Sequence, residues 1–337
     1  MLSRWLSFEK PLVEIEEQLD EIKRLAASEG IDTSSRQKLM DNIERLENHK
    51  REVMRGVYSD LSPWDKVQMA RHPKRPYSLD FIGALCTDWT ELHGDRAFGD
   101  DGAVVAGLAR FRGRAVAVVG NQKGRDTKER QARNFGQPSP EGLRKAGRVM
   151  EMAARFGRPI LSLVDTPGAA CSPQAEERGI SEAIAHSQML MSQLKVPIIV
   201  AIIGEGCSGG AIATALGDRV LMLEHAYYSV ISPEACASIL FRDPAKAPVT
   251  AEQLKITAED ALRFGVIEEI VPEPLGGAHR DLKTMSRILG DAIERHLNEL
   301  GHLSGEELVE ARYQRFRRLG AFDEPQNGFK PELNGHA

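Results

Sequence analysis

Short apolar runs rich in β-branched residues alternate with helix-like stretches from about residue 77 to residue 272, and this alternation limits the fold more than any other feature. Most of the runs are apolar throughout, which is typical of strands that are covered on both faces. Repeated strand–helix units of this kind predict an α/β fold. The runs that we expect to form strands are residues 115–119, 160–164, 197–203, 220–223, 228–231 and 267–271.

Helical patterns flank this region on both sides. Apolar residues three and four positions apart predict a helical hairpin over residues 11–58, with Gly30 ending its first helix, whereas the prolines of segment 71–77 exclude regular helix. A last apolar stripe over 285–297 is followed by a basic helix at 312–318. We therefore expect three parts, which are a hairpin and linker at 1–75, the main domain with its C-terminal helices at 76–320, and a disordered tail at 321–337.

The composition excludes several classes of protein. A chain of 337 residues with 42% apolar and 28% charged residues can form a hydrophobic core without disulfides or metal. The net charge of -5 argues against a protein that coats nucleic acid or an anionic membrane. The four cysteines lack the spacing of a zinc ribbon or a disulfide framework. With neither a signal peptide nor a membrane-spanning run in the sequence, we expect a soluble, cytoplasmic protein.

A glycine-rich segment, residues 204–213, directly follows the apolar run at 197–203 and has four glycines within seven residues. Such a strand-to-helix turn leaves backbone N–H groups free to face a ligand, which predicts an anion or oxyanion site. The segment matches neither the P-loop nor the dinucleotide-binding pattern. The alternative is a glycine turn that packs closely against a neighbouring segment.

Two other expected strands also end in polar or small residues. DTPGA at 165–169 follows the run at 160–164, and AEERG follows it at 175–179. Loops at successive strand ends can face each other across one crevice. Segment 121–126 adds cations that could meet phosphates or carboxylates, or could remain as solvated surface charge.

These segments resemble the α subunit of the carboxyltransferase of bacterial acetyl-CoA carboxylase. The resemblance covers about residues 8–320, and its motifs are QKGRDTKER, RNFG, SPEGLRKA, DTPGA, AEERG, SEAIA, GEG followed by SGGA, YSVISPE and PEPLGGAHR. It implies a crotonase-like fold of stacked ββα units. It also implies a homologous, zinc-bearing β subunit in an α2β2 assembly, with biotin carboxylase and a biotin carboxyl carrier protein as further partners.

The reaction implied by this family moves a carboxyl group from carboxybiotin on the carrier to acetyl-CoA, giving malonyl-CoA for fatty acid synthesis. It needs backbone donors at the oxygens that gain negative charge, and no side-chain base. The resemblance assigns Gly209 and Gly210 as the oxyanion donors on the biotin side, and matches Gly168 and Ala169 to the facing loop.

Three further residues are expected to bind substrate or biotin, and none is expected to bind metal. Lys123 belongs to the QKGR motif, and Ala211 ends the SGGA motif. Arg178 matches the arginine of AEERG and is suited to orient a carboxylate. An ion pair of Arg178 with Glu176 or Glu177 at a helix start is the alternative.

The sequence departs from the family pattern at two places. Residues 170–174 read ACSPQ where the family has Tyr-Pro-Gly and a later Gly, and Cys207 stands where Gly is usual. These changes leave open a catalytically altered paralogue that acts on another acyl-CoA, or a non-enzymatic subunit that binds a partner or nucleic acid. A further alternative is a hydrolase on the same fold with Ser208 as nucleophile, which would need His186 or His225 beside it.

Overall fold

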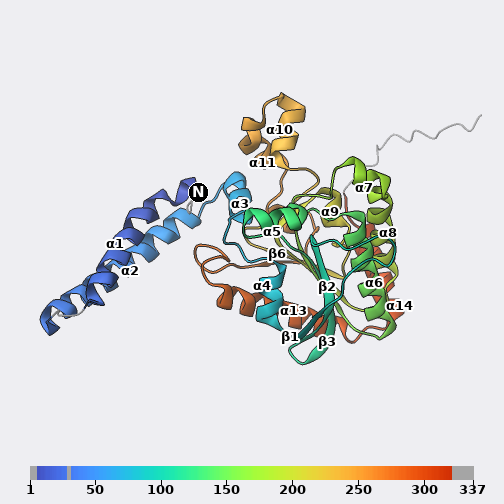
Figure 1. Cartoon of the computed structure of the whole chain (residues 1–337), viewed down its shortest axis with the longest axis horizontal. Helices are drawn as coiled ribbons and strands as arrows, with labels where there is room; N and C mark the ends of the chain where they lie inside the picture. Colours follow the sequence, from blue (N-terminus) through green and yellow to red (C-terminus); the bar gives the residue numbers. More distant parts are fainter. Residues whose placement is uncertain (1–5, 29–31, 321–337) are drawn as a thin grey trace, which may run out of the picture.

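A computed structural model describes residues 6–28 and 32–320, so Gly30 and the tail predicted at 321–337 lie outside the described residues. A central sheet carries helices on both faces, and two groups of helices project from it (Figure 1). The elements in chain order are η1 (Ser7–Glu9), α1 (Lys10–Ala26), α2 (Thr33–Tyr58), α3 (Pro63–Ala70), α4 (Ser78–Leu85), β1 (Cys86–Glu91), β2 (Val104–Phe111), β3 (Arg114–Asn121), α5 (Thr127–Ala132), η2 (Asn134–Gly136), α6 (Pro140–Arg155), β4 (Ile160–Thr166), α7 (Pro173–Glu177), α8 (Ile180–Gln193), β5 (Ile198–Cys207), α9 (Ser208–Ile212), β6 (Arg219–Leu223), β7 (Tyr227–Ser229), α10 (Pro233–Phe241), η3 (Pro244–Lys246), α11 (Ala247–Gln253), α12 (Ala258–Arg263), β8 (Glu269–Val271), α13 (Leu282–Leu300) and α14 (Gly305–Arg317).

The sheet has the strand order β1-β2-β3-β4-β5-β6-β8. The short strand β7 pairs with the last residues of β5, Glu205–Cys207, after the part of β5 that pairs with β6. Strands β1, β2 and β3 are antiparallel, and the strands from β3 to β8 are parallel. The predicted α/β class is therefore confirmed. The carboxyl ends of β3, β4 and β5 lie at one edge of the parallel part, where ligand sites of such sheets are usually found.

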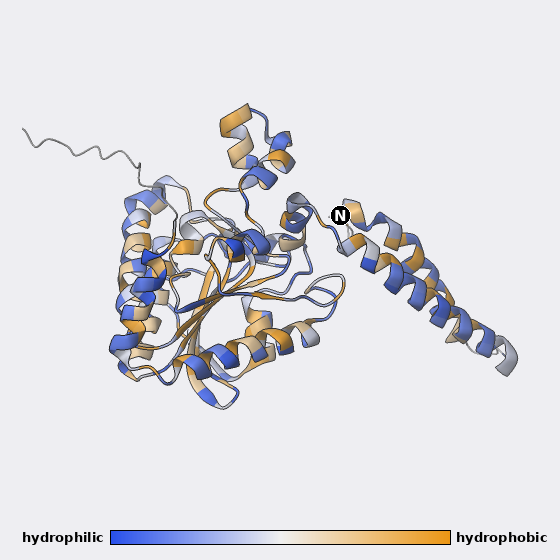
Figure 2. Cartoon of the chain, turned by 180° about the vertical axis from the view of Figure 1, so that it is seen from behind, coloured by the Kyte–Doolittle hydropathy of each residue, from blue (hydrophilic) through white to orange (hydrophobic). Residues whose placement is uncertain are grey.

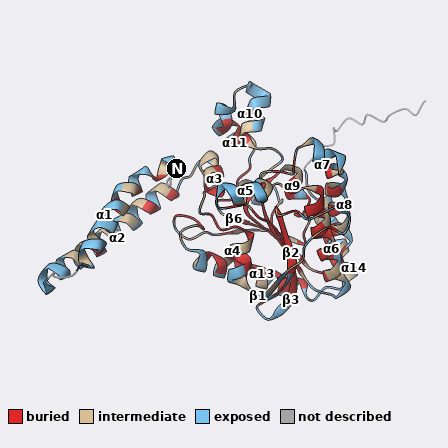
Figure 3. Ribbon diagram, viewed as in Figure 1, coloured by how far each residue is buried: buried red, intermediate tan, exposed pale blue. Residues whose placement is uncertain are grey.

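The helices form one layer on each face of the sheet. Helices α4 and α13 pack on one face, and α6 contacts β2 and β3 on the other face with α8 and α14 beside it (Figure 1). The stripe predicted on α13 is buried at Met285, Leu289, Ile293 and Leu297. Figure 3 shows that the strands are buried between these layers, as continuous apolar runs require.

The predicted hairpin is confirmed as α1 and α2, which pack along each other and project away from the sheet (Figure 1). Its apolar faces pack together because each helix has one apolar stripe. The base of the hairpin is fixed by Arg280, which donates to Glu16 at 2.8 Å and to Glu9 at 3.1 Å. Segment 71–77 is irregular, as its prolines predict.

A second projection consists of α10 and α11. Figure 2 colours much of α10 as hydrophobic, and Ile239 and Leu240 of this helix are each more than 60% exposed, as is Val230 in the segment before it. Apolar side chains that gather at the surface mark a site of protein interaction more often than scattered ones do. In the described ranges 6–28 and 32–320, no helix has the length and apolar character needed to cross a membrane.

Candidate active site

The glycine-rich segment continues strand β5 instead of forming a four-glycine turn. Strand β5 extends to Cys207, and α9 begins at the next residue, Ser208, which has a positive φ of 55°. The first two glycines of the segment therefore lie in the strand. A Cβ at Gly204 would lie 2.4 Å from Asp165 Oδ1, and one at Gly206 would lie 2.9 Å from the ring of Tyr228. Close packing, the alternative weighed from the sequence, explains these two glycines.

The other two glycines, Gly209 and Gly210, occupy the first turn of α9. Among the described residues their N–H groups donate to no side chain and to no backbone group outside the helix, as is usual for the first turn of a helix. A Cβ at Gly210 would lie 2.6 Å from both the nitrogen of Ala169 and the carbonyl carbon of Gly168. The two loops expected to face each other are therefore in contact, and four predicted site residues lie together.

The loop after β4 is held by its own residues. The hydroxyl of Thr166 donates to the carbonyl of Gly168 at 2.8 Å and accepts from the Gly168 N–H at 3.1 Å. Gly168 has a φ of +142°, a conformation that side chains disfavour. These bonds and the backbone of Gly168 fix the shape of the loop that packs against Gly210 of α9.

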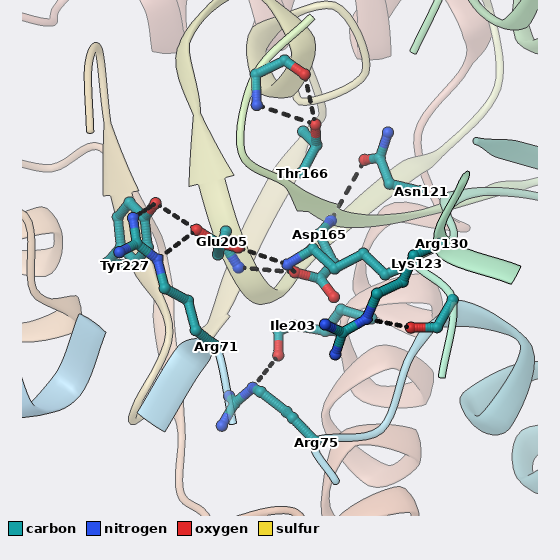
Figure 4. Close-up of polar contacts among 12 residues, drawn as sticks. Arg71, Arg75, Asn121, Lys123, Arg130, Asp165, Thr166, Ile203, Glu205 and Tyr227 are labelled. Carbon is teal, nitrogen blue, oxygen red and sulfur yellow. Dashed lines mark hydrogen bonds and ion pairs between the residues drawn. The ribbon is translucent and has the colours of Figure 1, made fainter. Parts of the chain in front are cut away.

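A buried ion cluster lies beneath these loops, at the carboxyl ends of β3, β4 and β5 (Figure 4). The ammonium of Lys123 contacts Asp165 Oδ1 at 2.6 Å and Glu205 Oε1 at 2.7 Å. Asp165 Oδ1 also accepts from the Glu205 backbone N–H at 2.9 Å, whereas Asp165 Oδ2 is buried without a partner. The cluster ties together the strand ends that carry the two loops.

Glu205 is the centre of the cluster. Its Oε2 accepts from Arg71 Nε at 2.7 Å and from the hydroxyl of Tyr227 at 2.8 Å. Burial would raise the pKa of Glu205, but Lys123 and Arg71 outweigh burial and lower this pKa to about 2. Asp165 has no such second cation, and burial raises its pKa against the opposing effect of Lys123. Glu205 is therefore ionised at neutral pH.

Lys123 was expected either to bind substrate or to carry solvated surface charge. The second expectation is wrong, because its side chain is only 12% exposed. The ammonium is already shared by Asp165 and Glu205, so its assignment as a substrate ligand stays a prediction, and its contacts give it a different role as the tie between strand ends.

Arg178 and Ala211 make no hydrogen bond or ion pair with this cluster in the described residues. Arg178 Nε donates to Glu141 of α6 at 2.6 Å, so the ion pair considered with Glu176 or Glu177 is wrong. The side chain of Ala211 is fully buried in the main core, so only its backbone could meet a ligand. Substrate binding by either residue stays a prediction.

The segment that departs from the family pattern, 170–174, starts a short helix. Ser172 Oγ accepts from the N–H of Ala175 at 3.2 Å, and Pro173 occupies the first position of α7. Both residue types favour the start of a helix. The N–H of Ala170 donates to the carbonyl of Pro138 at 2.9 Å. The changed residues therefore form a capped, hydrogen-bonded segment.

The hydrolase alternative lacks a base. Ser208 adopts the strained backbone of a nucleophile turn, but neither His186 nor His225 forms a hydrogen bond with it. Arg312 and Arg315 of the basic helix α14 are likewise engaged with Asp218 and Glu268 inside the fold. A nucleic-acid face on α14 therefore gains no support.

The sequence analysis missed Arg71, Glu205 and Tyr227. Glu205 had a visible signal, because it is the only acidic residue in the apolar stretch of 197–213. A carboxylate in a strand that is buried on both faces requires cationic or hydrogen-bonding partners. Arg71 had no such signal, since it lies in an irregular segment 134 positions earlier.

The fold is that of the crotonase-like carboxyltransferases. Transcarboxylase 12S superposes with a TM-score of 0.53 at 19% identity, covering 76% of this chain and 45% of that chain. A chain of the Pseudomonas malonate decarboxylase hetero-tetramer in complex with coenzyme A gives a TM-score of 0.52 at 19% identity, over 71% of this chain and 97% of that chain. Identities this low establish the fold alone.

Sequence comparison identifies the family. The family model described as "Acetyl co-enzyme A carboxylase carboxyltransferase-like" matches residues 5–320, and the chain belongs to this family. A Cyanothece protein named acetyl-coenzyme A carboxylase carboxyl transferase subunit alpha is 51% identical, over 94% of this chain and 96% of its own length. The protein of the same name from Bordetella avium is 50% identical, over 96% and 99%.

Proposed function

We propose that this chain is the α subunit of an acetyl-CoA carboxylase carboxyltransferase, which transfers a carboxyl group from carboxybiotin to acetyl-CoA to form malonyl-CoA. The observation that carries this proposal is about 50% identity, over nearly the whole chain, to proteins with that name. The contact between the Gly168–Ala169 loop and Gly210 of α9 supports it, because the proposed reaction needs fixed backbone donors.

The residues present fit biotin as the carrier of the carboxyl group. Bound biotin supplies the carboxyl group and an oxygen that gains negative charge during transfer. Gly209 and Gly210 would hold that oxygen, because they lie in the first turn of α9, where N–H groups can donate to a ligand, and they carry no side chain of their own. Lys123 and Glu205 would act indirectly by fixing the strand ends that carry these donors.

The proposed enzyme works in an assembly. Its partners would be a homologous, zinc-bearing β subunit in an α2β2 tetramer, a biotin carboxyl carrier protein and a biotin carboxylase, in the cytoplasm. A crotonase-like chain provides one oxyanion site, whereas the reaction develops charge at two oxygens, one on each substrate. The exposed apolar residues of the projection formed by α10 and α11 support a subunit that binds a partner.

The experiment combines the purified chain with a β subunit and measures malonyl-CoA formation from a carboxylated carrier. We expect transfer by the pair and none by the chain alone. Gly210→Ala keeps its N–H, but its Cβ would push the facing loop away and displace the donors, so turnover should fall by up to the about 10² to 10³-fold that losing one oxyanion donor costs.

Gly209→Ala is the matched control for that variant. Its Cβ would meet only the end of the Ile184 side chain, at 2.9 Å, which can move aside. Turnover should therefore fall far less. Equal rates for both variants and the wild type, with the fold intact, would remove this loop from the site. Transfer by the chain without a β subunit would contradict the proposed assembly.

A further inference from the structure

A cavity of about 270 Å³ opens beside the buried ion cluster, and its wall includes Tyr77, Lys123, Arg130, Phe135, Pro167 and Glu205. Pro167 of this wall immediately precedes Gly168, the residue that packs against Gly210 of α9. The volume of the cavity lies below the range of pockets that enclose whole cofactors or drug-sized ligands. The cavity therefore suits a small reacting group.

The cations of this wall differ in whether they are already paired. Lys123 is shared by Asp165 and Glu205, and Arg71 contacts Glu205 and Glu234. Arg130 has no carboxylate within ion-pair distance in the described residues. Within the described part of the chain its one side-chain hydrogen bond runs from Nε to the carbonyl of Gly124 at 3.2 Å, and both terminal nitrogens of the guanidinium have no partner there.

The fold holds Arg130 in place although it has no acidic partner. Figure 4 shows Arg130 beside Lys123, with its Nε bonded to the main chain. A Cβ at Gly124 would lie 2.2 Å from the Arg130 nitrogen, so only glycine permits this close turn. Asp126 caps helix α5 through the N–H of Glu129 at 2.8 Å. The guanidinium is thus presented to the cavity from a tightly built turn.

The cavity wall also carries an aromatic residue with a strained backbone. Phe135 has a φ of +56°, which is rare for a bulky side chain, and it is 51% exposed. A Cβ at the next residue, Gly136, would lie 2.6 Å from Lys123 Cγ, so this turn packs directly on the ion cluster. Strain that packing maintains at an exposed aromatic residue is typical of ligand sites.

We propose that this cavity is the carboxylate pocket of the carboxyl-transfer site, and that Arg130 binds the carboxylate in transit; this inference rests on the proposed function. The unbonded nitrogens of a guanidinium match the two oxygens of a carboxylate. Phe135, Tyr77 and Pro167 give the pocket apolar walls that strengthen such a contact. The carboxylate belongs to carboxybiotin before transfer and to malonyl-CoA after it.

The test measures binding as well as rate, using the chain assembled with a β subunit. Affinities for malonyl-CoA and acetyl-CoA are determined by calorimetry, since these ligands differ by one carboxylate. Arg130→Gln should either weaken the binding of malonyl-CoA or raise KM for the carboxylated carrier, in each case about 10- to 100-fold. The affinity for acetyl-CoA should not change. Arg130→Lys keeps the positive charge but loses the paired N–H donors of the guanidinium, so its affinities should lie between those of the wild type and Arg130→Gln.

The matched control is Lys128→Gln, which removes one exposed charge from the same helix outside the cavity wall. It should leave both affinities and the rate unchanged. A loss of affinity for malonyl-CoA would place Arg130 where the acyl-CoA binds. A loss of affinity for the carboxylated carrier alone would place it where biotin binds. Unchanged values for both, or equal weakening of acetyl-CoA, would overturn the proposal.

These outcomes remain distinct from failure of the proposed function. If the wild-type assembly transfers no carboxyl group, the proposed function fails, and the two affinities still test the pocket. If Arg130→Gln does not fold, Arg130→Lys keeps the cation and gives the same comparison of malonyl-CoA with acetyl-CoA. Selective loss of affinity for malonyl-CoA or for the carboxylated carrier would still support the carboxylate pocket, and unchanged affinity for both would still overturn it.

Discussion

The two ends of the parallel strands are both held by buried ion pairs, and the two pairs differ in how fully they are satisfied. At the amino ends, Arg312 binds both oxygens of Asp218 at 2.9 Å. Its terminal nitrogens also donate to the carbonyls of Met191, Leu194 and Val196. At the carboxyl ends, the cluster of Lys123 and Asp165 leaves one carboxylate oxygen without a partner and borders a cavity.

This difference separates a contact that stabilises the fold from one that also serves a site. A guanidinium whose donors are all used inside the protein has nothing left to offer a ligand. A cluster with an unpaired oxygen, a strained neighbour and a free cation nearby retains binding capacity. The carboxyl ends are also where open α/β sheets hold ligands. Variants at the two ends should therefore fail in different ways.

The largest expected effect is on stability at the amino ends. Arg312→Met leaves Asp218 buried without its partner, and should lower the free energy of unfolding by about 3–5 kcal/mol. Urea denaturation of the purified chain measures this loss. Arg317→Met in the exposed last turn of α14 is the control and should change little. A loss below about 1 kcal/mol for Arg312→Met would contradict the view that the ion pair at the amino ends mainly stabilises the fold.

Next in size is the loss of Lys123. Lys123→Met should cost about 2–4 kcal/mol of stability, less than Arg312→Met because Glu205, the second carboxylate of the cluster, keeps its ion pair with Arg71. Turnover of the assembled enzyme should also fall, because the strand ends that carry the oxyanion donors lose their tie. Urea denaturation and steady-state kinetics give the two values.

Lys145 provides the control for Lys123. It is more deeply buried than Lys123, and its ammonium contacts Asp100 at 2.6 Å and the carbonyl of Asp101 at 2.8 Å, away from the cavity. Lys145→Met should lower stability while the folded fraction keeps its turnover. If both lysine variants lose turnover equally, the cluster of Lys123 has only a structural role.

Acid should weaken the carboxyl ends through Glu205. Its pKa of about 2 in the folded chain lies below the ordinary 4.5, so its contribution is complete above pH 4.5 and is lost as the pH falls towards 2. The contribution is of order 2–3 kcal/mol. Unfolding free energies between pH 5 and 2 should fall less steeply for Glu205→Gln than for the wild type. Parallel slopes would contradict the pKa shift.

The smallest effect is expected where an ion pair is exposed. Lys195 and Glu306 lie 2.8 Å apart with side chains 63% and 75% exposed. Lys195→Ala should change the free energy of unfolding by at most about 1 kcal/mol, because water and salt screen the pair. Urea denaturation at low and high salt measures it. A loss as large as that of Arg312→Met would show that burial is not what separates these pairs.

Sequence predicted the strands that are buried on both faces, and its runs at 228–231 and 267–271 also located the short, partly exposed strands β7 and β8, although β7 ends at Ser229. β3, β4, β5 and β6 read as apolar runs because helices cover the sheet on each side. β1 was missed because it is an edge strand whose residues, CTDWTE, are half exposed. β2 was missed as well, although it is mostly buried. Only glycine fits at position 107 of this strand, because a Cβ there would lie 2.2 Å from the carbonyl oxygen of Thr90.

Sequence predicted the position of the site better than its contacts. Loops after successive parallel strands meet at one edge, so the contact between Gly168 and Gly210 followed from the order of the strands. The partners of Lys123 lie 42 and 82 positions away, and no local pattern encodes such pairs. Arg178 similarly pairs with Glu141 of α6 and not with Glu176 or Glu177, its neighbours in the sequence.

The mixed sheet also sets the order in which the chain can gain structure. In the antiparallel part, Val105 pairs with Gly120 only 15 positions away, whereas Gly120 pairs with Leu163, and Met222 with Ile270, across more than 40 positions. Closing long loops before their contacts form makes parallel pairing slow. The β1–β3 meander can therefore assemble while later strands are still being synthesised, and the proposed site is completed only after β5, β6 and β7 have joined it.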